Sequence, residues 1–262
     1  MAEPASIADS SKPNAGRVYD FLLGGSHNFE VDRHAAQEIL KLLPFFSQSA
    51  LVTRWFLGEA VRRLVAEGYR QFVDFASGLP TSDHIHQVAP PGTKVVYSDI
   101  DPITVAYGRD LVKDNPNVRY LEADAGKAEA LLSSPVVSEM FGKNPRVAIG
   151  FNGISWFLND DEVRHSLKVL YDWAEPGSKL FLSYVEASLV TEKMNSLMEL
   201  YEKLGQPGYA RSAEKQKELM GDWKVLDPGS LALEEWVDMQ KTVASQSQDS
   251  IGGLLRGVIL GK

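Results

Sequence analysis

Three carboxylates occur where short apolar runs of the chain end. Asp74 lies within the first run, Asp99 directly follows the second, and Asp124 comes two residues after the third. Carboxylates accept hydrogen bonds from hydroxyl and amino groups. If these runs are parallel strands of one sheet, their carboxyl ends meet at one edge, which is where such sheets bind ligands. The pattern therefore predicts a ligand site with three acidic side chains.

The loop after the first run, Asp74–Pro80, distinguishes between cofactors. Gly78 lets the backbone approach a ligand closely. A nicotinamide dinucleotide needs Gly-x-Gly-x-x-Gly, but Leu79 and Pro80 stand where further glycines would be. Asp74 would repel a pyrophosphate and suits the sulfonium and ammonium groups of S-adenosylmethionine. The chain has no Gly-Lys-Ser or Gly-Lys-Thr phosphate loop. The loop therefore favours S-adenosylmethionine over NAD and ATP.

The other two carboxylates suit the adenosine part of that cofactor. Asp99 can accept both ribose hydroxyls, and Asp124 is within reach of an adenine amino group. An acidic residue after a strand can also cap the next helix. We expect that role for Asp101, because Pro102 follows it at the first helical position. Three acidic strand ends in consecutive units favour an adenosine-type cofactor over three caps.

The elements that must position these residues are short apolar runs alternating with helical stretches. Five runs predict a parallel sheet covered by helices on both faces, hence an α/β fold. They are Gln71–Ala76, Lys94–Ser98, Val118–Glu122, Arg146–Asn152 and Lys179–Tyr184. Weaker runs at Trp223–Leu226 and Leu254–Leu260 predict further strands.

Helix signals surround the strands. Asn159 is expected to cap a helix that runs to about Ala174, and Asp32 one at Arg33–Leu43. Apolar spacings of three and four predict an amphipathic helix at Ser49–Gly68. Further helices are expected at Ser188–Leu204 and Arg211–Met220, whereas Asp227–Gly253 is polar and poorly patterned. We divide the chain into a tail, lid and helices at 1–68 and a cofactor-binding domain at 69–262.

Composition limits the class of protein. The chain has 262 residues, 27 basic and 35 acidic side chains and a net charge of −8, which disfavours nucleic-acid and anionic-membrane partners. It has no cysteine, so disulfides, thiolate metal sites and a cysteine nucleophile are excluded. We read no signal peptide and no membrane-spanning stretch, and we predict a cytoplasmic location.

Three segments resemble the actinobacterial S-adenosyl methyltransferase family, long catalogued as a domain of unknown function. They are Arg17-Val-Tyr-Asp-Phe-Leu-Leu-Gly-Gly, Phe72-Val-Asp-Phe-Ala-Ser-Gly-Leu-Pro-Thr and Val95-Val-Tyr-Ser-Asp-Ile-Asp-Pro, supported by Asn28-Phe29 and Asp32-Arg33. The match runs from about residue 12 to about residue 188. The resemblance implies a class I methyltransferase, Rossmann-like fold with a seven-stranded, mostly parallel sheet, an antiparallel last strand and an N-terminal helical lid.

The resemblance also implies the site. It puts Asp74 and Gly78 near the methionine half of S-adenosylmethionine, Asp99 at the ribose and Asp124 at the adenine. The predicted cofactor-binding residues are Asp74, Ala76, Ser77, Gly78, Asp99, Ile100, Asp124, Ala125, Asn152, Gly25 and Asn28. The chain departs from the family pattern at Ala76, where a glycine is common, and at Asn152–Trp156, where relatives carry an aliphatic run ending near a histidine. The second departure indicates an altered acceptor site.

A polar and glycine-rich cluster precedes the sheet. It comprises Arg17, Tyr19, Gly24, Gly25, His27 and Asn28. One interpretation is a capped helix and a turn; the resemblance favours a lid that closes over the cofactor and excludes water. Tyr19, His27 and Glu186 are candidates to orient or deprotonate the attacking atom. The remaining histidines are expected at the surface, and no metal site is predicted.

Aromatic residues gather near the predicted pocket. The expected acceptor-binding residues are Phe151, Trp156, Phe157, Trp55 and Tyr184. Such a wall suits a flat aromatic acceptor, although large apolar residues are also ordinary core. We predict an S-adenosylmethionine-dependent methyltransferase acting on a small aromatic molecule, with indole as a specific guess, in secondary metabolism. A homodimer is expected. The alternatives are a non-catalytic cofactor-binding regulator and a protein methyltransferase.

Overall fold

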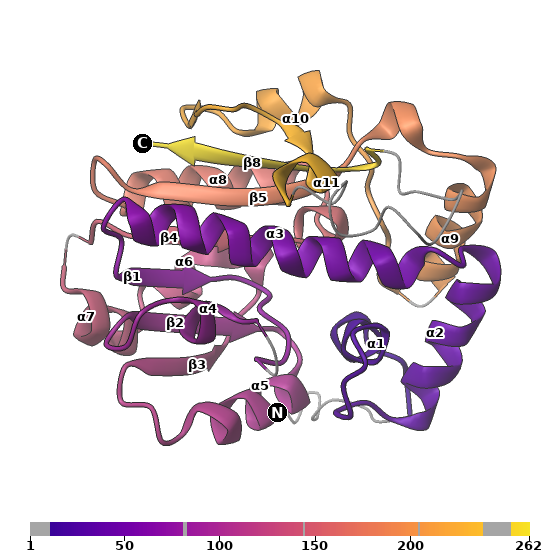
Figure 1. Ribbon diagram of the computed structural model, residues 1–262, viewed down its shortest axis with the longest axis horizontal. Helices are drawn as coiled ribbons and strands as arrows, with labels where there is room; N and C mark the ends of the chain where they lie inside the picture. Colours follow the sequence, from indigo (N-terminus) through magenta and orange to yellow (C-terminus); the bar gives the residue numbers. More distant parts are fainter. Residues whose placement is uncertain (1–10, 81–82, 144, 204, 238–252) are drawn as a thin grey trace, which may run out of the picture.

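The predicted apolar runs form one mostly parallel sheet. The computed structural model describes residues 11–80, 83–143, 145–203, 205–237 and 253–262. Its strands are β1 (Gln71–Asp74), β2 (Lys94–Asp99), β3 (Val118–Glu122), β4 (Ala148–Phe151), β5 (Lys179–Val185), β6 (Lys224–Val225), β7 (Leu231–Ala232) and β8 (Leu255–Gly261). They lie in the order β3-β2-β1-β4-β5-β8-β6 (Figure 1). The first five strands are parallel, and β8 runs antiparallel between β5 and β6.

The sheet has eight strands where seven were expected. The additional strand is β7, which pairs with β8 through Leu231 and Ala232. It lies in the polar stretch Asp227–Gly253, and two residues are too few to show a strand period. Part of that stretch, residues 238–252, lies outside the described residues. The strand order and the reversed β8 agree with the predicted fold class.

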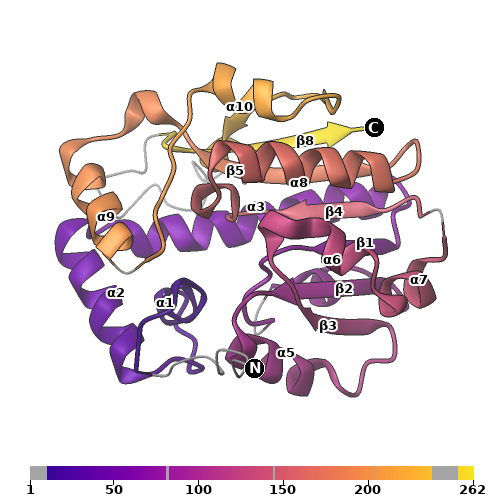
Figure 2. The ribbon, with the colours of Figure 1, turned by 180° about the vertical axis from the view of Figure 1, so that it is seen from behind.

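Alternate residues of the strands enter two separate cores. On β1, Phe72 packs into the core beneath α3 (Phe46–Ala66), whereas Val73 packs into the core on the opposite face. This alternation is the period of a strand buried on both sides. The first face is covered by α3, α4 (Ile85–Val88), α5 (Pro102–Val112) and α11 (Leu233–Trp236). The second is covered by α6 (Ala128–Leu132), α7 (Pro135–Phe141) and α8 (Asp160–Trp173) (Figure 2).

The remaining helices stand beyond the carboxyl ends of the parallel strands or beside β8. In Figure 1, α1 (Ala15–Leu22) and α2 (Glu30–Leu42) face those strand ends, with α9 (Glu192–Lys203) next to α2 and α10 (Ala213–Leu219) beside β8. Short 3₁₀ turns follow three strands, at Ala125–Lys127 (η1), Ser155–Phe157 (η2) and Ala187–Leu189 (η3). No helix in the described part of the chain is both long and apolar enough to cross a membrane.

Predicted caps explain where several helices begin. Asp101 accepts from the backbone N–H of Thr104 at the start of α5, and Asn159 caps α8. The expectation for Asp32 was wrong, because α2 begins three residues earlier, at Glu30. Asp32 instead lies in the first helical turn. Its carboxylate accepts a hydrogen bond from the Phe29 N–H, a backbone donor at the helix start that has no partner within the helix.

Two glycines inside helices provide a matched test of the packing. At Gly108 on α5, an added Cβ would lie 2.4 Å from a carbon of the Tyr120 ring, whereas at Gly58 on α3 the nearest atom is the flexible end of Arg62 at 3.4 Å. We expect Gly108→Ala to lower the free energy of unfolding by about 1–3 kcal/mol through overpacking. Gly58→Ala should raise it by about 0.5–1 kcal/mol. Urea denaturation measures both, and equal changes would contradict the packing of α5 on β3.

Candidate functional site

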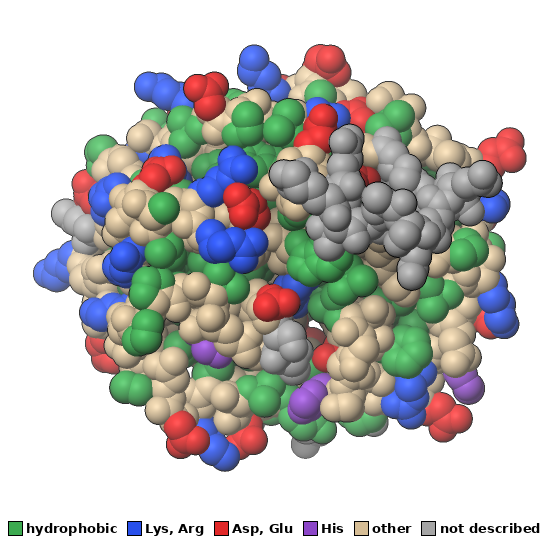
Figure 3. Space-filling view, viewed as in Figure 1, with side chains coloured by type: hydrophobic (Ala, Val, Ile, Leu, Met, Phe, Trp, Pro, Cys, Tyr) green, Lys and Arg blue, Asp and Glu red, His purple; other side chains and the backbone are tan. Residues whose placement is uncertain are grey.

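A cavity of about 530 Å³ opens at the carboxyl ends of the parallel strands. This volume lies within the range of roughly 300–1,000 Å³ usual for small-molecule sites. The cavity adjoins the point between β1 and β4 where the strand order reverses, the usual ligand position in such sheets. Its walls come from α1, α3, α9, the loops after β1 to β4 and the end of β5. Figure 3 shows a small opening in this region, with hydrophobic side chains on one side of it and charged side chains nearby.

The glycine loop forms one wall through an unusual backbone. Gly78 has a φ of +64°, and a side chain built on it would meet no other atom within 4 Å. Ala76 also has a positive φ, +50°, which explains why a glycine is common at this position. Ser77 holds the loop by donating its hydroxyl to the Asp74 carbonyl. The loop therefore keeps a short turn open toward the cavity at some cost in strain.

Asp99 lies at the end of β2 and faces this loop. One of its oxygens accepts from the Gly78 N–H at 3.0 Å and the other from the Asp101 N–H at 3.0 Å. Burial raises the pKa of Asp99 to about 6, against the lowering effect of these two N–H groups. Each carboxylate oxygen keeps a further lone pair, so Asp99 can still accept two hydroxyl groups.

Asp74 faces the same cavity with less support. The side chain is 2% exposed, and its Oδ2 atom has no hydrogen-bond partner. Burial raises its pKa to about 6; a hydrogen bond from Ser77 and the charge of Arg54 oppose that rise. Arg54 on α3 also lines the cavity. We did not identify Arg54 from the sequence, because it looks like one of several polar residues on an amphipathic helix.

The third strand end completes the acidic rim. Asp124 lines the cavity and accepts a hydrogen bond from the Gly126 N–H at 2.8 Å, so it also starts the η1 turn. Ala125 lies beside it in the lining. Ile100 follows Asp99 and is 61% exposed at the cavity wall. The cavity wall therefore carries an exposed apolar side chain as well as the acidic loop ends.

Asn152 joins the cavity wall to the helix above it. Its amide NH₂ donates to the Thr53 carbonyl on α3 at 3.1 Å, and its carbonyl accepts the Ser183 hydroxyl at 2.7 Å. Asn152 thus links β4, β5 and α3 at the sheet edge, a role that accounts for a polar residue where an aliphatic run was expected.

Part of the cavity lining, called the apolar end below, consists of aromatic rings. Trp156 and Phe157, on the η2 turn after β4, line it together with Tyr201 from α9. The Phe157 ring contacts Tyr201 edge to face at 5.6 Å between centroids and Trp156 at 6.4 Å. Tyr184 at the end of β5 also lines the cavity. Tyr201 was missed at the sequence level because α9 follows the strand pattern and carries no motif.

Tyr19 is the predicted catalytic candidate that lines the cavity. Its hydroxyl donates to the Ala50 carbonyl on α3 at 2.8 Å. Burial raises the pKa of Tyr19, although the nearby Arg54 charge opposes this shift. The phenol is therefore protonated at neutral pH, so Tyr19 can orient a ligand or donate a hydrogen bond but is a poor base.

Other predicted residues do not line the cavity. His27, Gly25 and Asn28 fold around the Asp20 carboxylate, which accepts from the His27 N–H and the Asn28 amide at 2.9 Å each. A Cβ on Gly25 would collide with that carboxylate at 2.1 Å, which explains the glycine. The His27 ring instead contacts the Tyr107 ring edge to face, with 5.2 Å between the ring centroids.

Three further predicted residues occupy structural positions outside the cavity lining. Phe151 is fully buried and packs against Phe75 in the second core. Trp55 is half-buried and packs against the first core. Glu186 accepts from the backbone N–H and hydroxyl of Ser188, which starts the η3 turn. The expectation of surface histidines was wrong for His84, which is fully buried. Within the described residues, no group of three or more histidine and carboxylate side chains is arranged to hold a metal ion.

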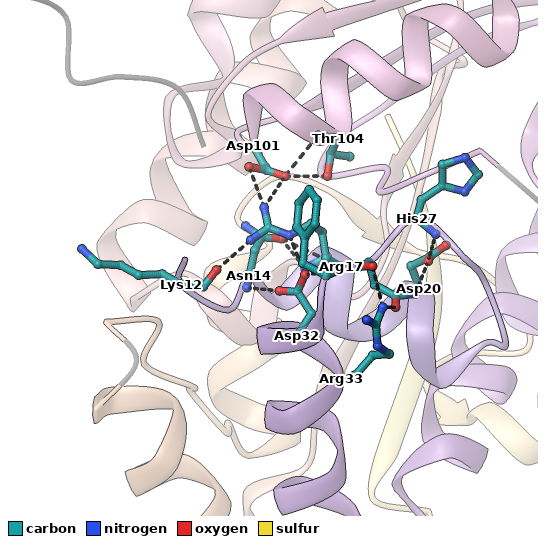
Figure 4. A network of polar contacts seen from close by, with 12 residues as sticks. Lys12, Asn14, Arg17, Asp20, His27, Asp32, Arg33, Asp101 and Thr104 are labelled. Atoms are coloured by element: carbon teal, nitrogen blue, oxygen red, sulfur yellow. Dashed lines mark hydrogen bonds and ion pairs between the residues drawn. The ribbon is translucent and has the colours of Figure 1, made fainter. Parts of the chain in front are cut away.

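A buried ion network fixes the N-terminal helices beside the cavity (Figure 4). The Arg17 side chain on α1 is 2% exposed and pairs with Asp32 on α2 at 2.8 Å and with Asp101 at 3.2 Å. Its third nitrogen donates to the Lys12 carbonyl at 2.8 Å. Asp101 is thus more than the predicted cap, since it also binds Arg17. Because its N–H donates to Asp99, the network reaches the cavity wall.

Comparison with known proteins identifies the family. The model of the S-adenosyl methyltransferase family matches residues 1–258. The chain belongs to this family. It is therefore an S-adenosylmethionine-dependent methyltransferase, as the motifs predicted. A search of curated proteins finds no match.

Solved structures of similar proteins agree with this assignment. A candidate methyltransferase from Thermobifida fusca is 33% identical with a TM-score of 0.87, and the alignment covers 97% of this chain and 96% of that one. A DUF574 family protein from Streptomyces avermitilis is 24% identical with the same TM-score, covering 97% and 99%. The magnesium protoporphyrin IX methyltransferase of Synechocystis with bound S-adenosylmethionine is 12% identical, with a TM-score of 0.54 over 99% and 100% of the two chains, and shows the fold alone.

The side chains that line the cavity match the functional groups of S-adenosylmethionine. S-adenosylmethionine carries hydroxyl donors, an amino-substituted flat ring and two positive charges. The cavity presents Asp99 with free lone pairs, Ile100 as an exposed apolar side chain, and Asp74 with an unpartnered buried oxygen. The cofactor would supply donors for the remaining lone pairs of Asp99 and for the unpaired Asp74 Oδ2, and an apolar ring face for Ile100.

Asp74 should make the ligand-free protein sensitive to pH. Its ordinary pKa of 3.8 is raised to about 6 in the folded state, so the folded protein binds the proton more tightly. Stability contributed by the protonated form is present below about pH 4 and is lost as the pH rises through about 6. We expect Asp74→Asn to stabilise the ligand-free protein by about 1–3 kcal/mol at pH 8 and by much less at pH 4.5.

Urea denaturation of the Asp74 variant at both pH values measures this difference. Asp114→Asn, at an exposed position, is the matched control and should change stability little at either pH. A stability gain for Asp74→Asn that is the same at both pH values would contradict a raised pKa.

The Arg17 network predicts a large loss when its cation is removed. Arg17→Met leaves the buried carboxylates of Asp32 and Asp101 without their shared partner, which typically costs about 3–5 kcal/mol. Arg164→Met is the control, because Arg164 is 45% exposed and its ion pairs should contribute about 1 kcal/mol or less. Urea denaturation compares the two, and similar losses would show that the buried network does not hold α1 and α2.

Proposed function

We propose that this methyltransferase transfers the methyl group of S-adenosylmethionine to a small, flat aromatic molecule, with an indole as the specific candidate. The observation that carries the proposal is the apolar end of the cavity, lined by Trp156, Phe157 and Tyr201. Aromatic rings of this kind favour edge-to-face or offset contacts with another ring. The acidic end of the same cavity is occupied by the cofactor in this proposal, so the apolar end receives the acceptor.

The proposed cofactor placement uses the three strand ends. Asp99 accepts the ribose hydroxyls, Asp124 accepts from the adenine amino group, and the exposed Ile100 packs on the adenine ring. Asp74 faces the ammonium of the methionine half. The remaining predicted cofactor residues that line the cavity are Ala76, Ser77, Gly78, Ala125 and Asn152.

The chemistry required of the protein is alignment. When bound, the cofactor supplies a methyl group on a sulfonium, which a nucleophile displaces in line. Holding two reactants in the correct geometry can lower the barrier by roughly 7–11 kcal/mol in the best cases. Tyr19 is protonated at neutral pH and its hydroxyl is bound to Ala50, so it positions the reactants and does not remove a proton. This favours an acceptor atom that attacks before losing a proton, such as an electron-rich ring carbon.

The metabolic setting, the location, the oligomeric state and the exclusion of nucleic acid, all predicted from the sequence, remain proposals. Secondary metabolism is the setting that a small aromatic acceptor suggests. A cytoplasmic location and a homodimer are expected, and the net charge of −8 argues against nucleic acid as the acceptor.

An acceptor panel tests the function. The purified protein is incubated with S-adenosylmethionine and indoles, phenols or amines, and mass spectrometry detects products heavier by one CH₂ unit. We expect an indole to be methylated. Methylation of phenols or amines alone would replace the indole assignment, and methylation of a protein alone would favour the protein methyltransferase alternative. Cofactor binding without turnover of any acceptor would favour the regulatory alternative.

A ring deletion tests the position of the acceptor. Phe157→Ala removes a half-buried ring from the apolar end, and an aromatic pair contributes roughly 0.5–1.5 kcal/mol beyond its buried area. We expect kcat/KM for the acceptor to fall at least several-fold, while the affinity for S-adenosylhomocysteine stays nearly constant. Phe45→Ala is the matched control, because Phe45 is also half-buried but does not line the cavity. Equal effects of the two variants on acceptor kinetics would contradict the proposed acceptor position.

A further inference from the structure

A tyrosine on the third strand binds the backbone of the loop after β1. The hydroxyl of Tyr120 on β3 donates to the Gly78 carbonyl at 2.6 Å, although the two residues are 42 positions apart in the chain. The Gly78 N–H donates to Asp99 at the end of β2 at 3.0 Å. Both polar backbone atoms of Gly78 are therefore bound by side chains of neighbouring strands. Gly78 lines the cavity and Tyr120 does not, so Tyr120 influences the cavity through this loop.

The packing of its ring makes the Tyr120 hydroxyl a fixed donor. The side chain is 3% exposed, and its ring lies 5.8 Å from the Tyr97 ring between centroids. On α5, a Cβ added to Gly108 would come within 2.4 Å of a carbon of the Tyr120 ring. A ring packed so closely cannot turn its hydroxyl away without displacing its neighbours. Burial also raises the pKa of Tyr120 well above its ordinary value, so the hydroxyl keeps its proton.

The loop needs such a support because its backbone is strained. Ala76 has a φ of +50°, a conformation that is costly for a residue with a Cβ. A strained turn persists only where its surroundings hold it. Ser77 holds the first half of the loop, because its hydroxyl donates to the Asp74 carbonyl at 2.9 Å. The hydrogen bond from Tyr120 to Gly78 holds the second half.

We propose that Tyr120 is a positioning residue for S-adenosylmethionine, which keeps the loop after β1 in the conformation that receives the cofactor. The inference rests on the proposed function in one respect, the placement of the cofactor at Gly78 and Asp99. Without the hydroxyl, the Gly78 carbonyl loses its donor, and the strain at Ala76 favours other loop conformations. The apparent dissociation constant of the cofactor then rises in proportion as the binding-competent fraction of the protein falls.

Removal of a single oxygen atom tests this role. Tyr120→Phe keeps the ring that packs on Gly108 and removes only the hydroxyl. Calorimetry measures the binding of S-adenosylhomocysteine to the full chain. We expect the dissociation constant to rise roughly three- to tenfold, the range produced by the loss of one hydrogen bond. An unchanged affinity would overturn the proposal.

Tyr97→Phe is the matched control. Tyr97 is the register partner of Tyr120 on β2, is fully buried, and accepts the His86 N–H of α4 at 2.9 Å. This variant therefore loses a comparable buried hydrogen bond that does not reach the loop. We expect both variants to lower the urea midpoint similarly, and Tyr120→Phe alone to weaken S-adenosylhomocysteine. Equal losses of affinity would mean that both tyrosines act through general stability, which would contradict the proposal.

A substitution within the loop separates positioning from a merely structural role. Glycine adopts a positive φ without strain, so Ala76→Gly removes the tendency of the loop to leave its conformation. In a chain that carries Ala76→Gly, we expect Tyr120→Phe to raise the dissociation constant of S-adenosylhomocysteine by about twofold or less. A structural role of Tyr120 would not respond to residue 76. The same loss of affinity with and without Ala76→Gly would therefore count against positioning.

Failure of the proposed function gives a different result. Asp99→Ala removes the expected partner of the ribose hydroxyls. An unchanged affinity of this variant for S-adenosylhomocysteine would contradict the proposed cofactor placement. A large loss in Asp99→Ala together with an unchanged affinity of Tyr120→Phe would leave that placement intact and overturn the role of Tyr120 alone.

Discussion

The buried guanidinium of Arg17 is the interaction on which the shape of the site depends. It connects α1, α2 and the start of α5, and it does so between residues up to 84 positions apart in the chain. Its ion pairs attach α1 to α2 and to the start of α5, and so hold both N-terminal helices at the carboxyl ends of the strands. Its partner Asp101 also donates its N–H to Asp99, so the same network holds a wall of the cavity. The N-terminal segment predicted as a lid is therefore built into the site.

A contrast between satisfied and unsatisfied charges runs through the protein. The charges that hold the fold together, those of Arg17 and Arg211, have partners in the chain. Asp74 and Arg54 form no ion pair although both are buried, and Asp74 Oδ2 and Arg54 Nε and Nη1 make no hydrogen bond. Such groups weaken the empty protein and strengthen a complex, because a ligand that supplies the missing partners recovers the cost of burying them. The positive φ at Ala76 belongs to the same pattern of strain kept near a ligand site.

The sequence supported the fold and the acidic side of the site because the relevant signals are local. Each strand is a short apolar run, and Asp74, Asp99 and Asp124 lie at or just after strand ends, so their meeting at one edge follows from parallel topology alone. The motifs also led to the family. The residues around His27 were harder to interpret, since the polar groups of a turn can bind a ligand or form hydrogen bonds within the turn itself. Here Asp20 occupies its centre.

What the sequence by itself determined was therefore the α/β class, the cofactor and the carboxylates that line the cavity, because these depend on periodicity and on loops next to strands. Only the tertiary structure decided which residues of the helices meet those loops. The charge of Arg54 acts on Asp74, and the Tyr201 ring contacts Phe157, through the packing of α3 and α9 at the sheet edge. The angle and rotation of a helix on a sheet follow from its whole buried face, a property that no short segment of the chain encodes.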